Sequence, residues 1–293
     1  MNSEAFVPLD IVPLSGALGA EVRGVDLRQP LERGAVDAIR DAWQEHVVLL
    51  FRDQALSPEA QIAFAGNFGA VGARSRPVAR RGAEEALDPR LMLISNIRRD
   101  GKPIGSLPDG EMFFHHDGCH AAEPYLGTFL YAIEVPAEGG NTCFANMCRA
   151  YDLLPADLRA RIGGLRALHA YDYGVTERLN PEADFSAVPH HVHPVVIQHP
   201  LSGRPALYVN RLMTVRIVGL PLAESSDLLD RLFAAGERRD NVYEHVWRPG
   251  DLVMWDNFAS MHARTDFPST ERRLMRRCAV GRQAIAGFAV TAH

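Results

Sequence analysis

Three residues with metal-binding side chains place the strongest constraint on the fold of this chain. The run Phe114-His115-His116-Asp117 offers a histidine and a carboxylate two positions apart, and His262 follows far downstream. In an extended strand, His115 and Asp117 point to one side while His116 points to the other, so two ligands can reach one ion. Two histidines and one carboxylate on one face of a metal are typical of non-haem Fe(II) oxygenases. A fold that uses this set must bring His262 beside the His-x-Asp pair.

Other interpretations of the histidines stay open at this point. A single histidine is more often a structural hydrogen-bonding residue than a ligand, so His262 could be a buried histidine of a β-barrel. A second cluster, His190-His191-Val192-His193, suggests zinc at first sight. Histidines crowded into four positions of a loop lack the ligand spacing of a structural zinc site, which disfavours that interpretation.

The arginines near the C-terminus indicate that anions bind inside the fold. The run from Arg273 to Val280 is strand-like, and alternation places Arg273 and Arg277 on one face. Arg272 and Arg276 then face outward, where water solvates them. Guanidinium groups that face a barrel interior are costly unless anions meet them, and arginine pairs with carboxylates in bidentate fashion. The run therefore predicts a dicarboxylate co-substrate and an anionic substrate.

Many short strand-like runs, separated by Gly and Pro turns, determine the expected fold class. Expected helices lie at 35–46, 57–68, 147–153, 156–162 and 223–236, and expected strands at 47–51, 91–94, 128–135, 195–197, 206–209, 242–247, 252–255 and 274–280. Strands and helices do not alternate regularly, which disfavours a doubly wound α/β fold. We expect a mainly β fold with flanking helices around a double-stranded β-helix (jelly-roll, cupin-like) core. A single domain over 1–293 is expected, with an irregular lid insertion around 172–190.

Composition disfavours several classes of partner. A formal net charge of −5 argues against a basic surface for nucleic acid. No apolar run approaches the roughly 18 residues that a membrane helix needs. The first residues lack the basic and apolar regions of a secretory signal, and the four cysteines lack C-x-x-C spacing, as expected of free thiols in a reducing compartment. We expect a cytoplasmic protein that binds neither nucleic acid nor membrane.

Blocks of sequence spread over the chain carry a resemblance to a known family. They are Pro13-Leu14 to Gly24-Val25-Asp26-Leu27, Phe114-His115-x-Asp117, Gly139-Gly140-Asn141-Thr142, His199-Pro200 to Tyr208-Val209-Asn210, Trp255-Asp256-Asn257 to His262, and Arg272-Arg273 to Arg277. Through these blocks the chain resembles, nearly end to end, the taurine dioxygenase and 2,4-dichlorophenoxyacetate dioxygenase (TauD/TfdA) family of Fe(II)/2-oxoglutarate-dependent enzymes.

The resemblance implies a role for each matching residue. His115, Asp117 and His262 resemble the iron ligands. Thr142 matches a hydroxyl that helps to hold 2-oxoglutarate, and Arg273 matches the guanidinium that binds its distal carboxylate. Arg277 matches a residue that contacts the substrate anion in members acting on sulfonates or carboxylates.

Two positions depart from the family pattern. Phe114 stands where a Trp commonly precedes the first ligand, and Glu111 stands where the taurine enzyme has a substrate-contacting amide. Glu111 is therefore a candidate substrate residue. An acidic side chain there would repel a sulfonate, which disfavours taurine as the substrate.

The activity implied by the resemblance uses Fe(II), 2-oxoglutarate and O₂. It oxidises, most commonly by hydroxylation, a C–H bond of a small anionic molecule and releases succinate and CO₂, in a homo-oligomer (dimer or tetramer). Desaturation, cyclisation or carbon–heteroatom cleavage of a biosynthetic intermediate is the alternative within this chemistry, whereas the carboxylate of Asp117 argues against a halogenase. Two other classes stay open: a metal-dependent hydrolase, which would not explain Thr142 or Arg273, and a non-enzymatic cupin-like binding protein.

Overall fold

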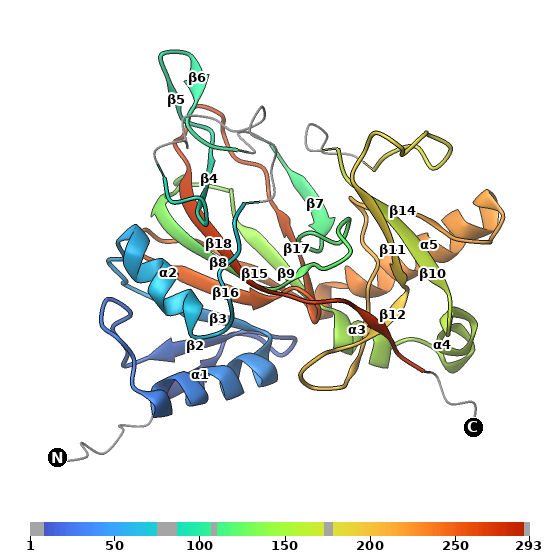
Figure 1. The fold of residues 1–293 in the computed structure, drawn as a ribbon, viewed down its shortest axis with the longest axis horizontal. Coiled ribbons are helices and arrows are strands. Elements are labelled where there is room, and N and C mark those ends of the chain that lie inside the picture. The colour runs from blue at the N-terminus through green and yellow to red at the C-terminus, as the bar shows by residue number, and fades with distance from the viewer. Residues whose placement is uncertain (1–8, 75–86, 107–109, 173–177, 290–293) are drawn as a thin grey trace.

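The computed structural model describes residues 9–74, 87–106, 110–172 and 178–289, and its centre is a pair of β-sheets (Figure 1). The larger sheet has seven strands in the order β1-β2-β3-β16-β8-β18-β4, and the smaller has four in the order β15-β9-β17-β7. The strand bounds are β1 (Asp10–Pro13), β2 (Ala20–Arg23), β3 (Val48–Phe51), β4 (Met92–Ser95), β7 (Met112–His115), β8 (Tyr125–Glu134), β9 (Thr142–Asn146), β15 (Val242–His245), β16 (Leu252–Asp256), β17 (Ser260–Arg264) and β18 (Leu274–Arg282). Side chains of both sheets line one inner cavity, so the sheets face each other across it.

The central strands of the larger sheet are buried, apolar and antiparallel. β8 lies between β16 and β18, and its Thr128 stands opposite Trp255 on one neighbour and Ala279 on the other. β3 is buried along its whole length, as its sequence Val-Leu-Leu-Phe predicts. These strands form one wall of the inner cavity, to which β18 contributes the polar side chain of Arg277.

The smaller sheet contains an irregularity that matters for the site. His262 on β17 pairs with His115 on β7, and two residues later Arg264 pairs with Met112, three residues before His115. One residue of β7 is therefore extra, which is a β-bulge. The bulge changes which side chains of β7 face the interior, and it lies directly beside two of the expected ligands.

The helices cover the outside of this core. Their bounds are α1 (Arg33–His46), α2 (Pro58–Gly66), α3 (Met147–Asp152), α4 (Ala156–Ile162) and α5 (Leu222–Gly236), followed by a short 3-10 helix, η3 (Arg239–Asn241). Ser57 caps α2 by accepting a hydrogen bond from the Ala60 amide at 3.1 Å, with Pro58 in the first turn. Figure 1 shows α1 and α2 beside the larger sheet and α4 and α5 at the opposite end of the molecule.

Three further sheets complete the chain. They are β11-β10-β14, β13-β12-β19 and the ribbon β5-β6, with bounds β5 (Arg98–Arg99), β6 (Lys102–Pro103), β10 (Arg166–Ala170), β11 (His190–Pro194), β12 (Val196–Gln198), β13 (Pro205–Leu207), β14 (Thr214–Ile217) and β19 (Ala286–Gly287). The expected strands at 195–197 and 206–209 correspond to β12 and β13, which pair antiparallel. Among the described residues, no helix combines the length and apolar character that a membrane crossing requires.

The structure confirms the expected helices and most of the expected strands, and it corrects two details. Asp117 does not lie on the strand of His115, because β7 ends at His115 and Asp117 follows in a turn. Arg276 does not face water: it is buried, donates to Gln61 at 2.7 Å and lies over the Tyr131 ring. The physical reason is that α2 covers this face of β18, which strand alternation alone does not reveal.

The expected lid at 172–190 is only partly described, because residues 173–177 lie outside the described residues. From 178 to 189 the chain has turns and no helix or strand, and β11 begins at His190. Phe185 is buried in a small apolar cluster with Leu168 and Val215. This part of the segment is therefore packed onto the sheet β11-β10-β14.

Candidate metal centre and active site

Three side chains converge between the two sheets. His115 comes from the end of β7, Asp117 from the turn that follows, and His262 from β17. One ligand atom from each lies within 4.8 Å of the others, which makes this the one group of three potential ligands in the described parts of the chain that could share an ion. The rings of His115 and His262 are 4.2 Å apart, and Asp117 Oδ1 is 4.0 Å from His115 Nε2.

Local backbone geometry aims these ligands. His115 Nδ1–H donates to the Phe113 carbonyl at 2.9 Å, because a carbonyl oxygen only accepts. The lone pair of Nε2 is then left for an ion, a common arrangement for metal-binding histidines. Gly118, with φ of +73°, turns the chain directly after Asp117 and lets the carboxylate point back toward His115.

Electrostatics keep the three groups in the protonation states that bind metal. Burial lowers the pKa of His115 and, more strongly, that of His262, so both rings are neutral at neutral pH. Burial alone would raise the pKa of Asp117, but Arg277 and the two ligand histidines bring it well below its usual range. The donor set of two neutral imidazoles and one carboxylate fits Fe(II).

The inner cavity also contains the residues expected to bind the co-substrate. Its lining includes His115, Asp117, Thr142, His262, Arg273 and Arg277, so six of the seven predicted site residues meet there. Arg273 immediately precedes β18, while Thr142 begins β9 on the opposite sheet. A molecule between the two sheets can therefore contact both.

Arg273 is a buried cation that forms no ion pair with a described residue. The residue is 2% exposed, and its Nε and Nη1 have no hydrogen-bond partner among the described residues. Burial, with a smaller contribution from Arg264, lowers the pKa of Arg273 to about 9. A buried guanidinium without a partner is costly, so its place beside the three ligands fits the carboxylate of a bound co-substrate.

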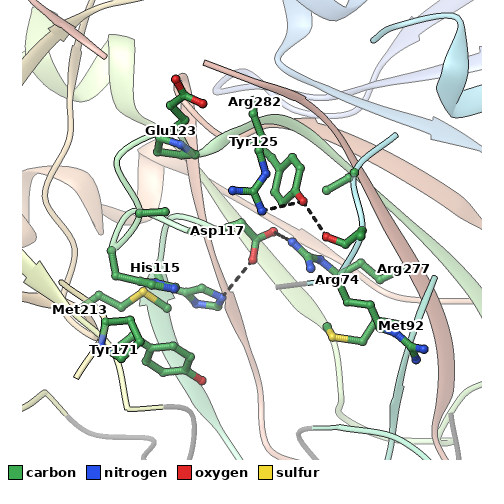
Figure 2. A pocket seen from close by; sticks show the side chains of 18 of the residues that line it. Arg74, Met92, His115, Asp117, Glu123, Tyr125, Tyr171, Met213, Arg277 and Arg282 are labelled. Carbon is green, nitrogen blue, oxygen red and sulfur yellow. Dashed lines mark hydrogen bonds and ion pairs between the residues drawn. The ribbon is translucent and has the colours of Figure 1, made fainter. Parts of the chain in front are cut away.

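A larger outer cavity of about 420 Å³ is also lined by His115, Asp117 and Arg277 (Figure 2). Asp117 lies between His115 and Arg277 in Figure 2, and Arg277 Nη2 is 2.8 Å from Asp117 Oδ2. The rest of the lining includes the apolar and aromatic residues Met92, Met112, Met213, Tyr125 and Tyr171. At the rim, Arg282 donates to the Tyr125 hydroxyl at 2.9 Å.

Glu111 does not join the site, contrary to the sequence-based prediction. It is exposed and lines neither cavity. Plain strand alternation would put Glu111 on the face of His115, but the extra residue of β7 puts buried Met112 on that face instead. Met112 lines both cavities and takes the place expected for Glu111.

The second histidine cluster has a structural explanation. His190, His191 and His193 lie along β11, so alternate side chains point to opposite faces. His193 is buried, and its Nε2–H donates to the Ala121 carbonyl at 2.9 Å. The zinc interpretation therefore has no support in the structure.

Sequence reasoning missed three residues that support the site. Trp247 donates from Nε1 to the Thr142 hydroxyl at 3.0 Å, and Thr128 donates to Asp117 Oδ2 at 2.8 Å. Asn257 donates to Thr128 at 2.9 Å. Of these three residues, only Asn257 could have been identified from the sequence, because it belongs to the Trp-Asp-Asn block before His262.

Comparisons with known proteins place the chain in a family. The family described as "Taurine catabolism dioxygenase TauD, TfdA family" matches residues 10–279. The (S)-phenoxypropionate/alpha-ketoglutarate-dioxygenase of Sphingobium herbicidovorans is 34% identical, over 91% of this chain and 92% of that protein. Pentalenolactone F synthase of Streptomyces avermitilis is also 34% identical, over 92% of this chain and 93% of that protein.

A solved structure extends the similarity to the fold. The crystal structure of AAD-2 in complex with Mn(II) and N-oxalylglycine matches with a TM-score of 0.77 and 30% identity, covering 94% of this chain and 98% of that chain. The similarity confirms the predicted jelly-roll core with flanking helices. The chain therefore belongs to the TauD/TfdA dioxygenase family.

Proposed function

We propose that this chain is an Fe(II)- and 2-oxoglutarate-dependent dioxygenase that hydroxylates a C–H bond of a small organic anion, with release of succinate and CO₂. One observation carries the proposal: a group of two histidines and one carboxylate shares an inner cavity with the buried Arg273, whose Nε and Nη1 have no partner among the described residues. A metal-dependent hydrolase would not explain Arg273, and a cupin-like binding protein would have no reason to retain an open set of three metal ligands.

Each site residue then has a defined task. His115, Asp117 and His262 would hold Fe(II), and the metal with its co-substrate and O₂ supplies the oxidising chemistry when bound. Arg273 would pair with the distal carboxylate of 2-oxoglutarate in bidentate fashion, and Thr142 would donate a hydrogen bond to it. The buried apolar wall formed by Ile94 and Leu130 excludes water around these contacts.

The position of Arg277 supports an anionic substrate. Its guanidinium faces the outer cavity, where a substrate carboxylate can pair with it. Apolar and aromatic side chains of the same cavity suit a hydrophobic body attached to that carboxylate.

A different oxidative outcome is the second candidate. The same iron chemistry can lead to desaturation, cyclisation or carbon–heteroatom cleavage of a biosynthetic intermediate. The similarity to a protein named as a pentalenolactone F synthase supports this alternative.

We also propose several properties of the chain as a whole. A single domain over 1–293 is supported by the family match from 10 to 279 and by one hydrophobic core that joins both sheets. A lid around 172–190 is supported by Tyr171, Pro189 and His190, which border the outer cavity. We also propose a homo-oligomer, dimer or tetramer, in the cytoplasm.

The test is an anaerobic titration of the protein with Fe(II) and then 2-oxoglutarate, monitored by the weak visible charge-transfer band of the chelate. Wild-type protein should develop the band, and Arg273→Ala should require much higher 2-oxoglutarate. Arg272→Ala is the matched control, because Arg272 is exposed and pairs with Glu134 at 2.7 Å. Absence of the band from iron-loaded wild-type protein would remove 2-oxoglutarate from the proposal.

A further inference from the structure

A chain of buried hydrogen bonds connects Trp255, in the Trp-Asp-Asn block, to the Oδ2 atom of Asp117. Trp255 Nε1 lies 2.9 Å from Asn257 Oδ1, and Asn257 Nδ2 lies 2.9 Å from Thr128 Oγ1. Thr128 Oγ1 in turn lies 2.8 Å from Asp117 Oδ2. Trp255, Asn257 and Thr128 are at most 1% exposed, so water does not compete for these bonds.

The direction of every bond in this hydrogen-bond chain is fixed by its two ends. An indole nitrogen can only donate, so Asn257 must present its oxygen to Trp255 and its NH₂ to Thr128. An ionised carboxylate can only accept, so Thr128 must give its single hydrogen to Asp117. No bond in this hydrogen-bond chain can reverse without leaving a buried polar group unpaired.

The hydrogen-bonding capacity of Thr128 is fully used. Its hydrogen goes to Asp117, and its oxygen accepts from Asn257 and, at 3.3 Å, from Arg277 Nη2. Asp117 Oδ2 thereby receives two donors, Thr128 and Arg277, both at 2.8 Å. Oδ1 is left facing His115 Nε2 at 4.0 Å.

We propose that Thr128 and Asn257 are positioning residues that orient the Asp117 carboxylate, so that Oδ2 is held by protein donors and Oδ1 is presented to the metal. The proposal rests on the metal centre proposed above. The same hydrogen-bond chain begins at Trp255, whose ring packs 4.7 Å from that of His262, so one tryptophan supports two of the three ligands. The hydroxyl of Thr128, rather than its bulk, is the group that matters.

The test compares Thr128→Val with Thr128→Ser, because valine keeps the shape and loses the hydroxyl, whereas serine keeps the hydroxyl. Anaerobic Fe(II) titration by calorimetry and Mn(II) binding by electron paramagnetic resonance report on the site without turnover. Loss of a hydrogen bond that supports a metal ligand typically weakens metal binding about 10–100-fold. We expect that loss for Thr128→Val and near wild-type affinity for Thr128→Ser.

Each outcome decides one question. Equal metal affinity in wild type and Thr128→Val would overturn the proposal, as would equal losses in both variants, which would indicate packing. Failure of wild-type protein to bind either metal would instead overturn the proposed function. If Thr128→Val does not fold, Asn257→Ala provides the second test: it leaves Thr128 intact and should weaken metal binding several-fold, and wild-type affinity there would overturn the proposal.

Discussion

The indole nitrogen of Trp247 lies 3.0 Å from the hydroxyl oxygen of Thr142, and both residues are buried. Because the indole only donates, the Thr142 oxygen is the acceptor and its own hydrogen remains available. Thr142 also lines the inner cavity with Arg273. Trp247 therefore leaves the hydroxyl hydrogen of Thr142 free to be donated to a co-substrate carboxylate.

Removal of this bond should weaken co-substrate binding through Thr142 alone. Trp247→Phe should raise the Kd for 2-oxoglutarate about 2–10-fold, the value of one hydrogen bond. The measurement is the chelate titration in a double-mutant cycle with Thr142→Val. Trp43→Phe is the control, because Trp43 Nε1 has no partner among the described residues and Trp43 packs in the core under the larger sheet. An undiminished effect of Trp247→Phe in the Thr142→Val background would contradict the prediction.

Arg277 should determine substrate affinity. Arg277→Ala should raise the KM of an anionic substrate, such as a phenoxy acid, about 10–100-fold, because a charge-assisted hydrogen bond is lost. Succinate release against substrate concentration measures the effect. Arg282→Ala at the rim of the same cavity is the control and should change KM much less. An unchanged KM in Arg277→Ala would exclude this residue as the anion contact.

Stability should fall in mild acid because buried histidines must stay neutral. Burial lowers the pKa of His193 to about 4 and takes the pKa of His169 well below its ordinary value of 6.5. Above pH 6.5 both histidines are neutral in the folded and in the unfolded protein. As the pH falls toward 4, the histidines bind protons only in the unfolded chain, so the free energy of unfolding decreases. For His193 alone the loss reaches about 3 kcal/mol near pH 4.

Urea denaturation of the metal-free protein between pH 7.5 and 4.5 measures this slope. His193→Gln keeps a donor for the Ala121 carbonyl but cannot bind the proton, so its slope should be shallower than that of wild type. Parallel slopes for the two proteins would show that His193 does not contribute.

Gly127 should tolerate no side chain. A Cβ at this position of β8 would come within 2.6 Å of the Trp43 ring, which is fixed in the core. Gly127→Ala should therefore lower the free energy of unfolding by about 1–3 kcal/mol. Gly16→Ala has open space around its Cβ and should be nearly neutral in the same urea titration. Equal stability of the two variants would contradict the packing argument.

The sequence predicted those features that depend on neighbouring residues. Apolar runs predicted β3 and β16, helical spacing predicted α1 and α5, and the His-x-Asp spacing predicted that two candidate ligands would meet at one point. These features can be predicted locally, because the spacing of apolar residues within one segment indicates which face of the strand or helix is buried.

The errors and omissions arise where distant segments meet. The bulge that excludes Glu111 is defined by pairing with β17, and the burial of Arg276 is defined by α2. In the sequence, nothing distinguishes Thr128 from other residues of an apolar strand. Only the fold shows that its hydroxyl hydrogen-bonds to both Asp117 and Asn257. Periodicity within one segment contains no information about such partners.

The guanidinium of Arg273, which pairs with no carboxylate of the described residues, has a consequence for the lifetime of the protein. A dicarboxylate that pairs with it stabilises only the folded state, so mass action links the folded fraction to the supply of co-substrate. The thermal unfolding midpoint of the iron-loaded protein should rise with 2-oxoglutarate concentration. An unchanged midpoint would show that the co-substrate does not stabilise the folded protein. Where the dicarboxylate is scarce, we expect proteases to degrade the protein that lacks bound co-substrate faster. The cellular amount of the protein would then follow the concentration of 2-oxoglutarate.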